Sequence, residues 1–400
     1  MSGAPETNPI IGIVGAGTMG AGIAQIALEH GHEVVVHDVD EAAIERGRDR
    51  IRAGLARRAA KLDLDADSVD AWVDGRLGGL RAAPSLDALA ADVDVVIEAA
   101  LEDLGLKQEI FRALDGAAGR DDLILATNTS ALSVASIASA TIRPERVVGL
   151  HFFNPAPVMR LVEVVTPAGV AHDIAEHAAQ LVTSWGKVPV RCADAPGFIV
   201  NRVNRPYTIE ALRLLEAGEA SVEAIDAALR EAGFPMGPFE VIDLAGVDVN
   251  LAAATGVWEG LGRPERLRPS PIQGRLVAEG SLGRKTGQGF HLYEAGRRTG
   301  VAAAFTGQEG SLEPDEIRER ILLGVVNEAY HAVGEGVAAA DDVDVALRLG
   351  AAHPIGPFER VREMGGPGDV RARLTELSGT HVRYEPAPAL ATVAGAPQGG

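Results

Sequence analysis

A histidine and a glutamate at strand spacing are the residues of this sequence best suited to acid–base chemistry. His151 lies at the end of one apolar, strand-like run, and Glu163 lies in the next. If the two strands are neighbours, the carboxylate can hold one imidazole nitrogen while the other nitrogen faces a substrate hydroxyl. A histidine taken alone would more often be a structural residue beside the sheet. The acid at strand spacing instead favours a general base with its orienting partner.

A glycine-rich turn, GAGTMG, indicates a dinucleotide site, because it follows an apolar strand and opens a helical run. Gly15 permits the tight turn, Gly17 lets the backbone approach a pyrophosphate, and Gly20 lets the helix pack closely on the sheet. The helix N-terminus then offers N–H groups and its positive dipole end to the phosphates. The alternative is a glycine turn in an unrelated α/β protein. The residues expected to bind the cofactor here are Gly15, Ala16, Gly17, Thr18, Met19 and Gly20.

Asp38 follows the second strand and completes this fingerprint. Its carboxylate can accept hydrogen bonds from ribose hydroxyls and would repel a 2′-phosphate. The sequence therefore predicts NAD rather than NADP as the cofactor.

Three further polar strings carry candidate ligand contacts. TNTSALS follows a strand, so Ser130 could donate to a substrate oxygen while Ser133 caps the next helix; the alternative for Ser130 is also a cap. In PGFIVNR, Asn201 falls one turn into a helix and would face the cleft, although alone it would more often be a polar surface residue. In GRKTGQGF, Lys285 could approach a phosphate, or the loop could simply close its domain.

The elements that must position these residues change along the chain. Strands and helices alternate over about the first 190 residues, which is typical of a parallel α/β sheet. Helical patterns without strands follow Pro196, the first of them over Ile199–Ala217. The string FPMGPFE, preceded by a helix, has a counterpart in HPIGPFE, which indicates a duplicated helical unit.

The predicted fold is an α/β Rossmann-type dinucleotide-binding domain followed by two all-α helical domains in tandem. We expect the NAD-binding domain over residues 1–193 and a helical substrate or dimerisation domain over 194–294. A linker over 294–311 and a degenerate second helical copy over 311–384 follow, and 385–400 has the composition of a disordered tail.

Composition narrows the classes of partner. Lys and Arg total 37 against 56 Asp and Glu, so the formal net charge is −19 and binding to nucleic acid or an anionic membrane is disfavoured. No charged residue occurs from Thr7 to Leu28, but the glycines there indicate a strand, turn and helix rather than a membrane span. The single cysteine, Cys192, suits a reducing compartment. We therefore expect a cytoplasmic protein, and we predict no metal site.

These motifs, in this order, resemble the L-3-hydroxyacyl-CoA dehydrogenase family over residues 10–293, with the weaker helical copy reaching about 379. The chain looks most like bacterial 3-hydroxybutyryl- and 3-hydroxyadipyl-CoA dehydrogenases with two C-terminal helical domains. The resemblance implies reversible, NAD-dependent oxidation of an (S)-3-hydroxyacyl-CoA to a 3-ketoacyl-CoA, in fatty-acid or aromatic-acid degradation. It gives His151 as the base, Glu163 as its partner, and Ser130 and Asn201 as contacts of the reacting oxygen.

The resemblance also implies ligand contacts outside the strongest motifs. Residues that match NAD-contacting positions are Glu102, Lys107, Ser130, Asn154 and Lys285. Lys61 matches a lysine near the CoA phosphates, and Gly54 stands where some relatives have a serine near CoA. Arg202 and Arg205 are candidates to bind a terminal carboxylate of the acyl chain, and the alternative is that both are solvated helix charges.

Two other functions remain open at this point. One is a hydroxy-acid or sugar-acid dehydrogenase on the same scaffold that does not need CoA, and the other is a non-catalytic NAD-binding protein. The expected assembly is a monomer, with the tandem helical domains as a pseudo-dimer, or a homodimer. Acyl chain length, the remaining CoA contacts and the pathway do not follow from the residues.

Overall fold

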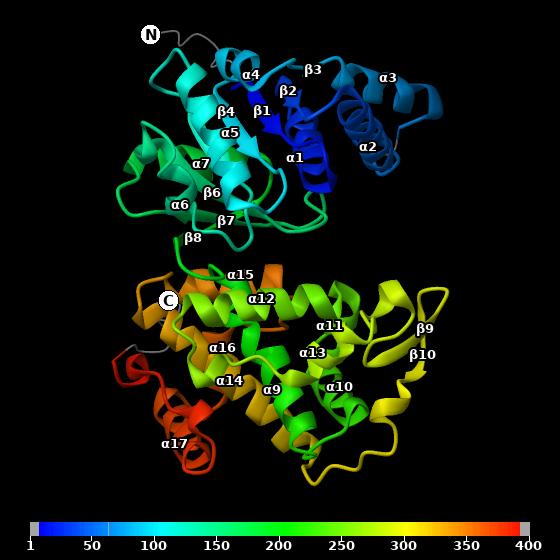
Figure 1. Ribbon diagram of the computed structural model, residues 1–400, viewed down its shortest axis with the longest axis vertical. Helices are drawn as coiled ribbons and strands as arrows, with labels where there is room; N and C mark the ends of the chain where they lie inside the picture. Colours follow the sequence, from blue (N-terminus) through cyan, green and yellow to red (C-terminus); the bar gives the residue numbers. More distant parts are fainter. Residues whose placement is uncertain (1–7, 63, 393–400) are drawn as a thin grey trace. The chain divides into compact units, whose positions relative to one another are not determined.

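The computed structural model describes residues 8–62 and 64–392. The chain divides into two compact units, with the boundary between Asp194 and Ala195. The first unit holds the sheet, and the second is mainly helical (Figure 1).

An eight-stranded sheet forms the centre of the first unit. Its strand order is β3-β2-β1-β4-β5-β6-β7-β8, and neighbouring strands are parallel except for the antiparallel pair β6 and β7. Because four central strands are fully buried, they read as continuous apolar runs rather than alternating ones. The strands are β1 (Ile11–Val14), β2 (Val34–His37), β3 (Leu80–Ala82), β4 (Val95–Glu98), β5 (Ile124–Thr127), β6 (Val147–Phe152), β7 (Leu161–Thr166) and β8 (Val188–Ala193).

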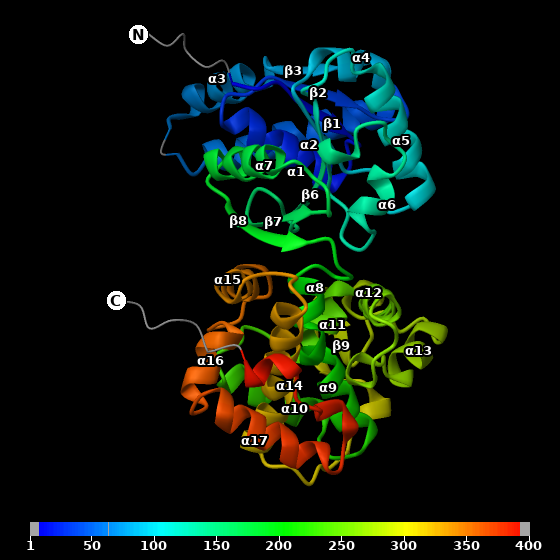
Figure 2. The same ribbon diagram turned by 90° about the vertical axis from the view of Figure 1, so that its left-hand side faces the viewer.

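Helices cover both faces of this sheet. Figure 2 shows α1, α2 and α7 on one side and α4, α5 and α6 on the other, which is the doubly wound arrangement. Short polar side chains begin most of these helices; Ser133, for example, accepts the Ser136 N–H at 3.1 Å and confirms the predicted cap. The helices are α1 (Thr18–Glu29), α2 (Glu41–Ala59), α3 (Ala66–Leu77), α4 (Leu86–Asp92), α5 (Leu104–Ala117), α6 (Val134–Ala138) and α7 (His172–Ser184).

The second unit is built around two long buried helices, α9 and α14, which lie in its middle in Figure 2. We call residues 195–293 the first helical segment and residues 314–392 the second. The first contains α8 (Val200–Val203), α9 (Arg205–Glu216), α10 (Val222–Glu231), α11 (Pro238–Ala245), α12 (Val247–Gly260) and α13 (Pro271–Ala278). The second contains α14 (Pro314–Gly334), α15 (Ala340–Gly350), α16 (Pro357–Glu363) and α17 (Pro367–Ser378).

The two segments repeat one local structure. In the first, Asp226 accepts the Phe239 N–H at 2.9 Å, and in the second, Asp344 accepts the Phe358 N–H at 2.8 Å. In both PxGPFE strings, the glutamate side chain also accepts the N–H of the glycine that begins the helix, at 2.9 Å for Gly237 and 2.7 Å for Gly356. A Cβ added to Gly237 or Gly356 would lie about 2.3 Å from the aspartate of its own segment, which explains the glycine at both positions.

Three expectations for this unit differ from the structure. A hairpin of β9 (His291–Glu294) and β10 (Arg297–Val301) overlaps the predicted linker, so the unit is not purely helical. The predicted helix over Ile199–Ala217 is broken at Asn204 into α8 and α9, because Pro206 has no N–H to continue the ladder.

The third difference concerns the predicted disordered tail. Its residues 385–392 are ordered, and residues 393–400 lie outside the described part of the chain. Asn327 donates to the Glu385 carbonyl at 2.9 Å and accepts the Ala387 N–H at 2.8 Å. Leu390 is buried. An alanine- and proline-rich composition concealed this docking, because only tertiary contacts order the segment.

Within the described residues, no single helix is both long and apolar enough to cross a membrane. The pair α11 and α12 passes the same test only when taken together across a bend of 102°.

Candidate active site

His151 and Glu163 face each other across β6 and β7. The antiparallel register sets the two residues directly opposite, and the His151 Nδ1 atom lies 2.6 Å from a carboxylate oxygen of Glu163. Both residues are buried, at 6% and 0% exposure. The contact predicted from strand spacing is therefore present. With Nδ1 held by a carboxylate, Nε2 is the imidazole nitrogen that can exchange a proton with a ligand.

The segment that follows His151 is fixed by a buried lysine. Asn154 is exposed at the end of β6, and its peptide bond to Pro155 is cis. The Lys187 ammonium donates to the carbonyls of Ala156 at 2.6 Å and Met159 at 2.8 Å. Burial lowers the pKa of Lys187 to about 8. Lys187 therefore ties the start of β8 to the loop that carries Asn154.

The glycine turn between β1 and α1 has the geometry that a dinucleotide requires. Gly15 has φ +95°, and a Cβ on Gly20 would lie 1.8 Å from the Gly15 carbonyl oxygen. A Cβ on Gly17, by contrast, would meet no atom within 4 Å. Gly17 also begins α1 without a side-chain cap, and the first turn holds no acidic residue. The turn therefore fits a pyrophosphate at the positive end of α1.

Asp38 supports this turn directly. One of its carboxylate oxygens accepts the Ala16 N–H at 2.6 Å, and the other accepts the Val39 N–H at 2.7 Å. The acid after β2 thus holds the glycine turn, and its contact with a ribose stays a prediction. Val39, next to it, is 90% exposed. Leu101, which follows β4, is 77% exposed. Both apolar side chains lie at the carboxyl ends of parallel strands, where ligands bind in such sheets.

Ser130 lies in a loop held by Glu102. One oxygen of the Glu102 carboxylate accepts the Ser130 N–H at 2.8 Å and the Ala131 N–H at 3.1 Å, and the Thr129 hydroxyl donates to it at 2.7 Å. Burial acts to raise the pKa of Glu102, but the Thr129 hydrogen bond and the Lys107 charge together lower it. Glu102 is therefore an anion that orders the Ser130 loop.

Beneath that loop lies a buried ion pair. The Lys107 ammonium is 2.6 Å from a carboxylate oxygen of Glu98 and 3.5 Å from Glu102. Thr127 donates to the second Glu98 oxygen at 2.7 Å. Glu98 and Lys107 are 0% and 1% exposed, so the lysine charge is neutralised inside the protein. The resemblance assigned Lys107 and Glu102 to NAD. Their observed contacts are internal, and a direct contact with NAD stays a prediction.

The sequence motifs missed several supporting residues. Asp194 accepts the Val134 N–H at 3.0 Å, the Ala135 N–H at 2.7 Å and the Ser133 hydroxyl at 2.8 Å, and so caps α6. The Asn128 side chain accepts the Phe152 N–H at 2.9 Å, beside His151. Asn128 and Glu98 could have been suspected, because each is a polar residue at the end of an apolar strand. No local sequence pattern marks Asp194 or Lys187 as a supporting residue.

Asn201 lies in the second unit, on α8. It is half-buried, and its carbonyl accepts a hydrogen bond from Arg205 Nε at 3.1 Å. Arg202 and Arg205 are only 0% and 7% exposed, so the alternative of solvated helix charges is wrong for both. Arg202 pairs with Glu328 at 2.7 Å. Burial lowers the pKa of Arg205 to about 10, and no described carboxylate lies within ion-pair distance of it.

Lys285 also lies in the second unit. Its ammonium is 2.6 Å from Asp248, at the start of α12. The loop that carries it closes on Asp243, which accepts the N–H groups of Phe290 and His291, each at 2.9 Å. A Cβ on Gly289 would lie 1.9 Å from that carboxylate, which explains one of the loop glycines.

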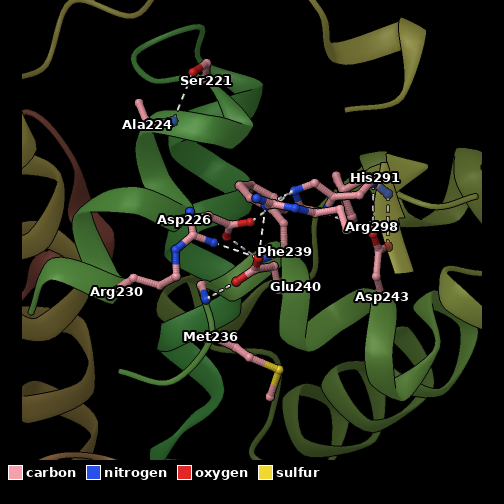
Figure 3. A network of polar contacts seen from close by, with 12 residues as sticks. Ser221, Ala224, Asp226, Arg230, Met236, Phe239, Glu240, Asp243, His291 and Arg298 are labelled. Atoms are coloured by element: carbon pink, nitrogen blue, oxygen red, sulfur yellow. Dashed lines mark hydrogen bonds and ion pairs between the residues drawn. The ribbon is translucent and has the colours of Figure 1, made fainter. Parts of the chain in front are cut away.

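A histidine between two aspartates anchors this loop (Figure 3). His291 is fully buried, with Nδ1 3.2 Å from Asp243 and Nε2 3.2 Å from Asp226. Burial alone would lower its pKa, but the two carboxylates raise the pKa of His291 to about 9. The imidazolium therefore joins α10, α11 and β9 at neutral pH.

The predicted CoA contacts have less structural support. Lys61 is exposed in the turn after α2, where it can reach an anion. A Cβ at Gly54 would lie 1.9 Å from the Gln25 side chain, so α1 and α2 approach too closely there for a larger residue. In the described part of the chain, no group of three or more His, Cys, Asp and Glu is arranged to hold a metal ion.

Comparison with known proteins covers nearly the whole chain. The family model "3-hydroxyacyl-CoA dehydrogenase, NAD binding domain" matches residues 10–195. The model "3-hydroxyacyl-CoA dehydrogenase, C-terminal domain" matches residues 197–293 and 317–400.

Two curated relatives and one solved structure are similar to the chain. The 3-hydroxyadipyl-CoA dehydrogenase of Escherichia coli K12 is 36% identical, over 89% of this chain and 90% of that protein. The 3-hydroxybutyryl-CoA dehydrogenase of Mycobacterium tuberculosis is 41% identical, over 71% of this chain and 98% of that protein. A crystal structure of 3-hydroxybutyryl-CoA dehydrogenase from Escherichia coli K12 superposes with a TM-score of 0.86 at 35% identity, covering 96% and 98% of the two chains.

Proposed function

Since this chain belongs to the 3-hydroxyacyl-CoA dehydrogenase family, we propose that His151 and Glu163 carry its reaction. The protein is an NAD-dependent oxidoreductase that acts on the hydroxyl group of 3-hydroxyacyl-CoA. The observation that carries the residue assignment is the buried 2.6 Å contact between the His151 Nδ1 atom and the Glu163 carboxylate. A fixed imidazole with a fully buried carboxylate behind it is what a general base needs.

In the proposed reaction, His151 Nε2 takes the proton of the (S)-3-hydroxyl group while C3 loses a hydride. Bound NAD supplies the hydride acceptor. Glu163 stabilises the imidazolium that forms. His151 then releases the proton to solvent, which completes the turnover. Ser130 and Asn201 donate hydrogen bonds to the oxygen on which negative charge develops.

The residues that would hold NAD are those of the glycine turn and its supports. Gly17 and the first turn of α1 face the pyrophosphate, Asp38 binds the adenosine ribose, and Asn154 and Lys285 complete the contacts. Support comes from the open space at Gly17 and the uncapped start of α1.

The first test replaces His151 with glutamine. We expect kcat for NADH oxidation with acetoacetyl-CoA to fall by about 10³-fold, while the Kd for NADH changes less than about twofold. His177→Gln, at an exposed position on α7, is the matched control and should retain activity. Full activity of His151→Gln, or turnover of a free hydroxy acid without CoA, would contradict the proposal.

A second feature bears on the acyl chain. Arg205 is a buried cation next to α8, and none of the described carboxylates lies close enough to pair with it. A buried cation without a nearby negative charge is costly unless a ligand supplies that charge. We propose that Arg205 binds a terminal carboxylate of the acyl chain, so that the preferred substrate is a dicarboxylic 3-hydroxyacyl-CoA. The name of the 3-hydroxyadipyl relative supports this choice.

The test compares two substrates in one variant. Arg205→Leu should lower kcat/KM for 3-ketoadipyl-CoA by about a hundredfold and leave acetoacetyl-CoA within about threefold. The control is Arg213→Leu, because Arg213 is similarly buried on α9 but already pairs with Glu265 at 3.2 Å. An equal loss for both substrates in Arg205→Leu would refute a role in specificity.

We also propose that the two helical segments are tandem copies that pair within one chain. Arg266 of the first segment binds Glu328 of the second at 2.7 Å, and Arg383 of the second binds Glu210 of the first at 2.8 Å. The reciprocal ion pairs support a pseudo-dimer, and the two matches to one C-terminal family model support a duplication. The interface that a homodimer would use is then already filled, so we expect a monomer.

A further inference from the structure

The second helical segment contacts α8, the helix that carries Asn201, and the residue that follows this helix; Arg202 pairs there with Glu335 at 2.8 Å as well as with Glu328. Glu328 on α14 accepts a hydrogen bond from Arg202 Nε at 2.7 Å, and both side chains are 1% exposed. His353, which precedes α16, has its Nε2 atom 2.8 Å from the Asn204 side-chain oxygen. The residues contacted, Arg202 and Asn204, lie one and three residues after Asn201 along the chain.

The α8 helix is too short to be stabilised by its own backbone hydrogen bonds. It comprises four residues, begins after Gly197 and Phe198 at positive φ, and ends at the break before Pro206. Such a short helix is only marginally stable without tertiary contacts. Its orientation must therefore come from what packs on it.

The side chains of Glu328 and His353 are each held in place by further neighbours. Glu328 is held from its other side by Arg266 at 2.7 Å, so its carboxylate is fixed between two guanidinium groups. His353 packs on the rings of Tyr207 and Phe234, with ring centroids 6.0 and 4.8 Å apart. Burial lowers the pKa of His353 to about 3, so the ring is neutral and Nε2–H donates to the Asn204 oxygen.

We infer that Glu328 and His353 of the second helical segment are positioning residues for Asn201. The inference rests on the proposed role of Asn201 as a donor to the reacting oxygen. It assigns the second segment a part in the reaction through its contacts with α8 and Asn204. A donor that is misplaced by about 1 Å loses much of its effect on the transition state.

The internal repeat supplies a matched control. Glu210 and Glu328 lie the same number of residues before Asp226 and Asp344, and each receives an arginine from the other segment. Glu210, however, binds Arg383 and Tyr384 instead of α8. Glu328→Gln and Glu210→Gln therefore weaken equivalent contacts of the interface, and only the first affects the support of Asn201.

The experiment measures NADH oxidation with acetoacetyl-CoA in these variants. Glu328→Gln should lower kcat/KM for acetoacetyl-CoA by about tenfold with the KM for NADH unchanged, whereas Glu210→Gln should stay within about twofold. Combined with Asn201→Ala, Glu328→Gln should cause no further loss, because the group that it positions is gone.

If Glu328→Gln folds poorly, a second pair of variants tests the same inference through His353. His353→Leu removes the donor to Asn204 and should lower kcat/KM about tenfold, and His353→Gln, which keeps a donor, should recover most of that loss.

Equal losses in Glu328→Gln and Glu210→Gln, or additive losses in the Asn201→Ala background, would overturn the inference. If Asn201→Ala leaves the rate unchanged, the role of Asn201 fails and the inference fails with it. A rate loss in Asn201→Ala but in neither Glu328→Gln nor His353→Leu would overturn the positioning role alone.

Discussion

The imidazole of His151 is oriented at its Nδ1 atom by Glu163, and Nε2 is the atom that we propose exchanges a proton with the substrate. Its Nδ1 atom is fixed by Glu163 at 2.6 Å, and β6 and β7 set the two residues opposite each other. A carboxylate in this place selects the tautomer of the imidazole and later stabilises its charge. Substitution of Glu163 alone tests tautomer selection and charge stabilisation while the base, His151, is kept.

Glu163→Gln keeps the size of the side chain but removes its charge. We expect kcat with acetoacetyl-CoA to fall by about 10²- to 10⁴-fold, because an amide can pin the wrong tautomer and cannot stabilise an imidazolium. NADH titration should show unchanged binding. Glu176→Gln, half-buried on α7, is the control. A loss below about twofold in Glu163→Gln would show that the pair does not work as a base and its partner.

At the scale of single residues, the sequence predicted the His151–Glu163 contact and the glycine turn better than the residues that support them. His151, Glu163 and the glycine turn could be found because strand spacing and a strand–turn–helix context are local patterns. The ion pair of Glu98 and Lys107, and the Lys187 clamp, join residues from different elements. Such contacts depend on the order of strands in the sheet, which local patterns do not contain.

At the scale of elements, the strands were predictable and the helical unit less so. Long apolar runs gave the central strands, but β3 is a three-residue edge strand with two exposed residues and has no such run. The hairpin of β9 and β10 was missed because glycine and charge dominate its composition. Its order comes from His291, whose two aspartates lie on α10 and α11. This contact joins elements that are distant along the chain.

The His291 contact makes a pH dependence testable. Because the pKa of His291 is raised to about 9 in the folded protein, its stabilisation is complete below about pH 6.5 and is lost as the pH rises through 9. The groups that face it are Asp226, Asp243, Tyr293 and Arg298. His291→Gln should cost roughly 2 to 3 kcal/mol at pH 6 and much less at pH 10.

Calorimetric unfolding of the wild type, His291→Gln and the control His177→Gln across this range would measure the difference. A cost that is the same at pH 6 and pH 10 would mean that the imidazolium does not carry the contact.

At the scale of the whole molecule, the chain contains one α/β unit and one helical unit with an internal repeat. The length indicated more than one core, and the PxGPFE strings predicted the duplication. What could not be predicted is that the two helical segments share one buried interface around α9 and α14, with ion pairs in both directions. Ion pairs between segments have no signature in either segment alone.

This interface leads to a prediction about assembly. The full chain should behave as a monomer of 41.6 kDa at micromolar concentration in light scattering after size-exclusion chromatography. Mutation of Glu210, which weakens the interface within the chain, is expected to lower the unfolding temperature without changing the mass. A stable dimer of the wild type would contradict the pseudo-dimer.

Asp38 has a consequence for how this enzyme could be redesigned. The carboxylate that we propose binds the ribose and repels a 2′-phosphate also accepts the Ala16 N–H at 2.6 Å and so supports the glycine turn. Replacing it with glycine or alanine to admit NADP would remove the repulsion and, in the same step, leave an amide of the turn without its acceptor. A single substitution of this kind would therefore admit NADP and at the same time weaken the turn that binds the coenzyme. Asparagine, which keeps an acceptor oxygen and loses only the charge, is the first step that an engineer or natural selection could take.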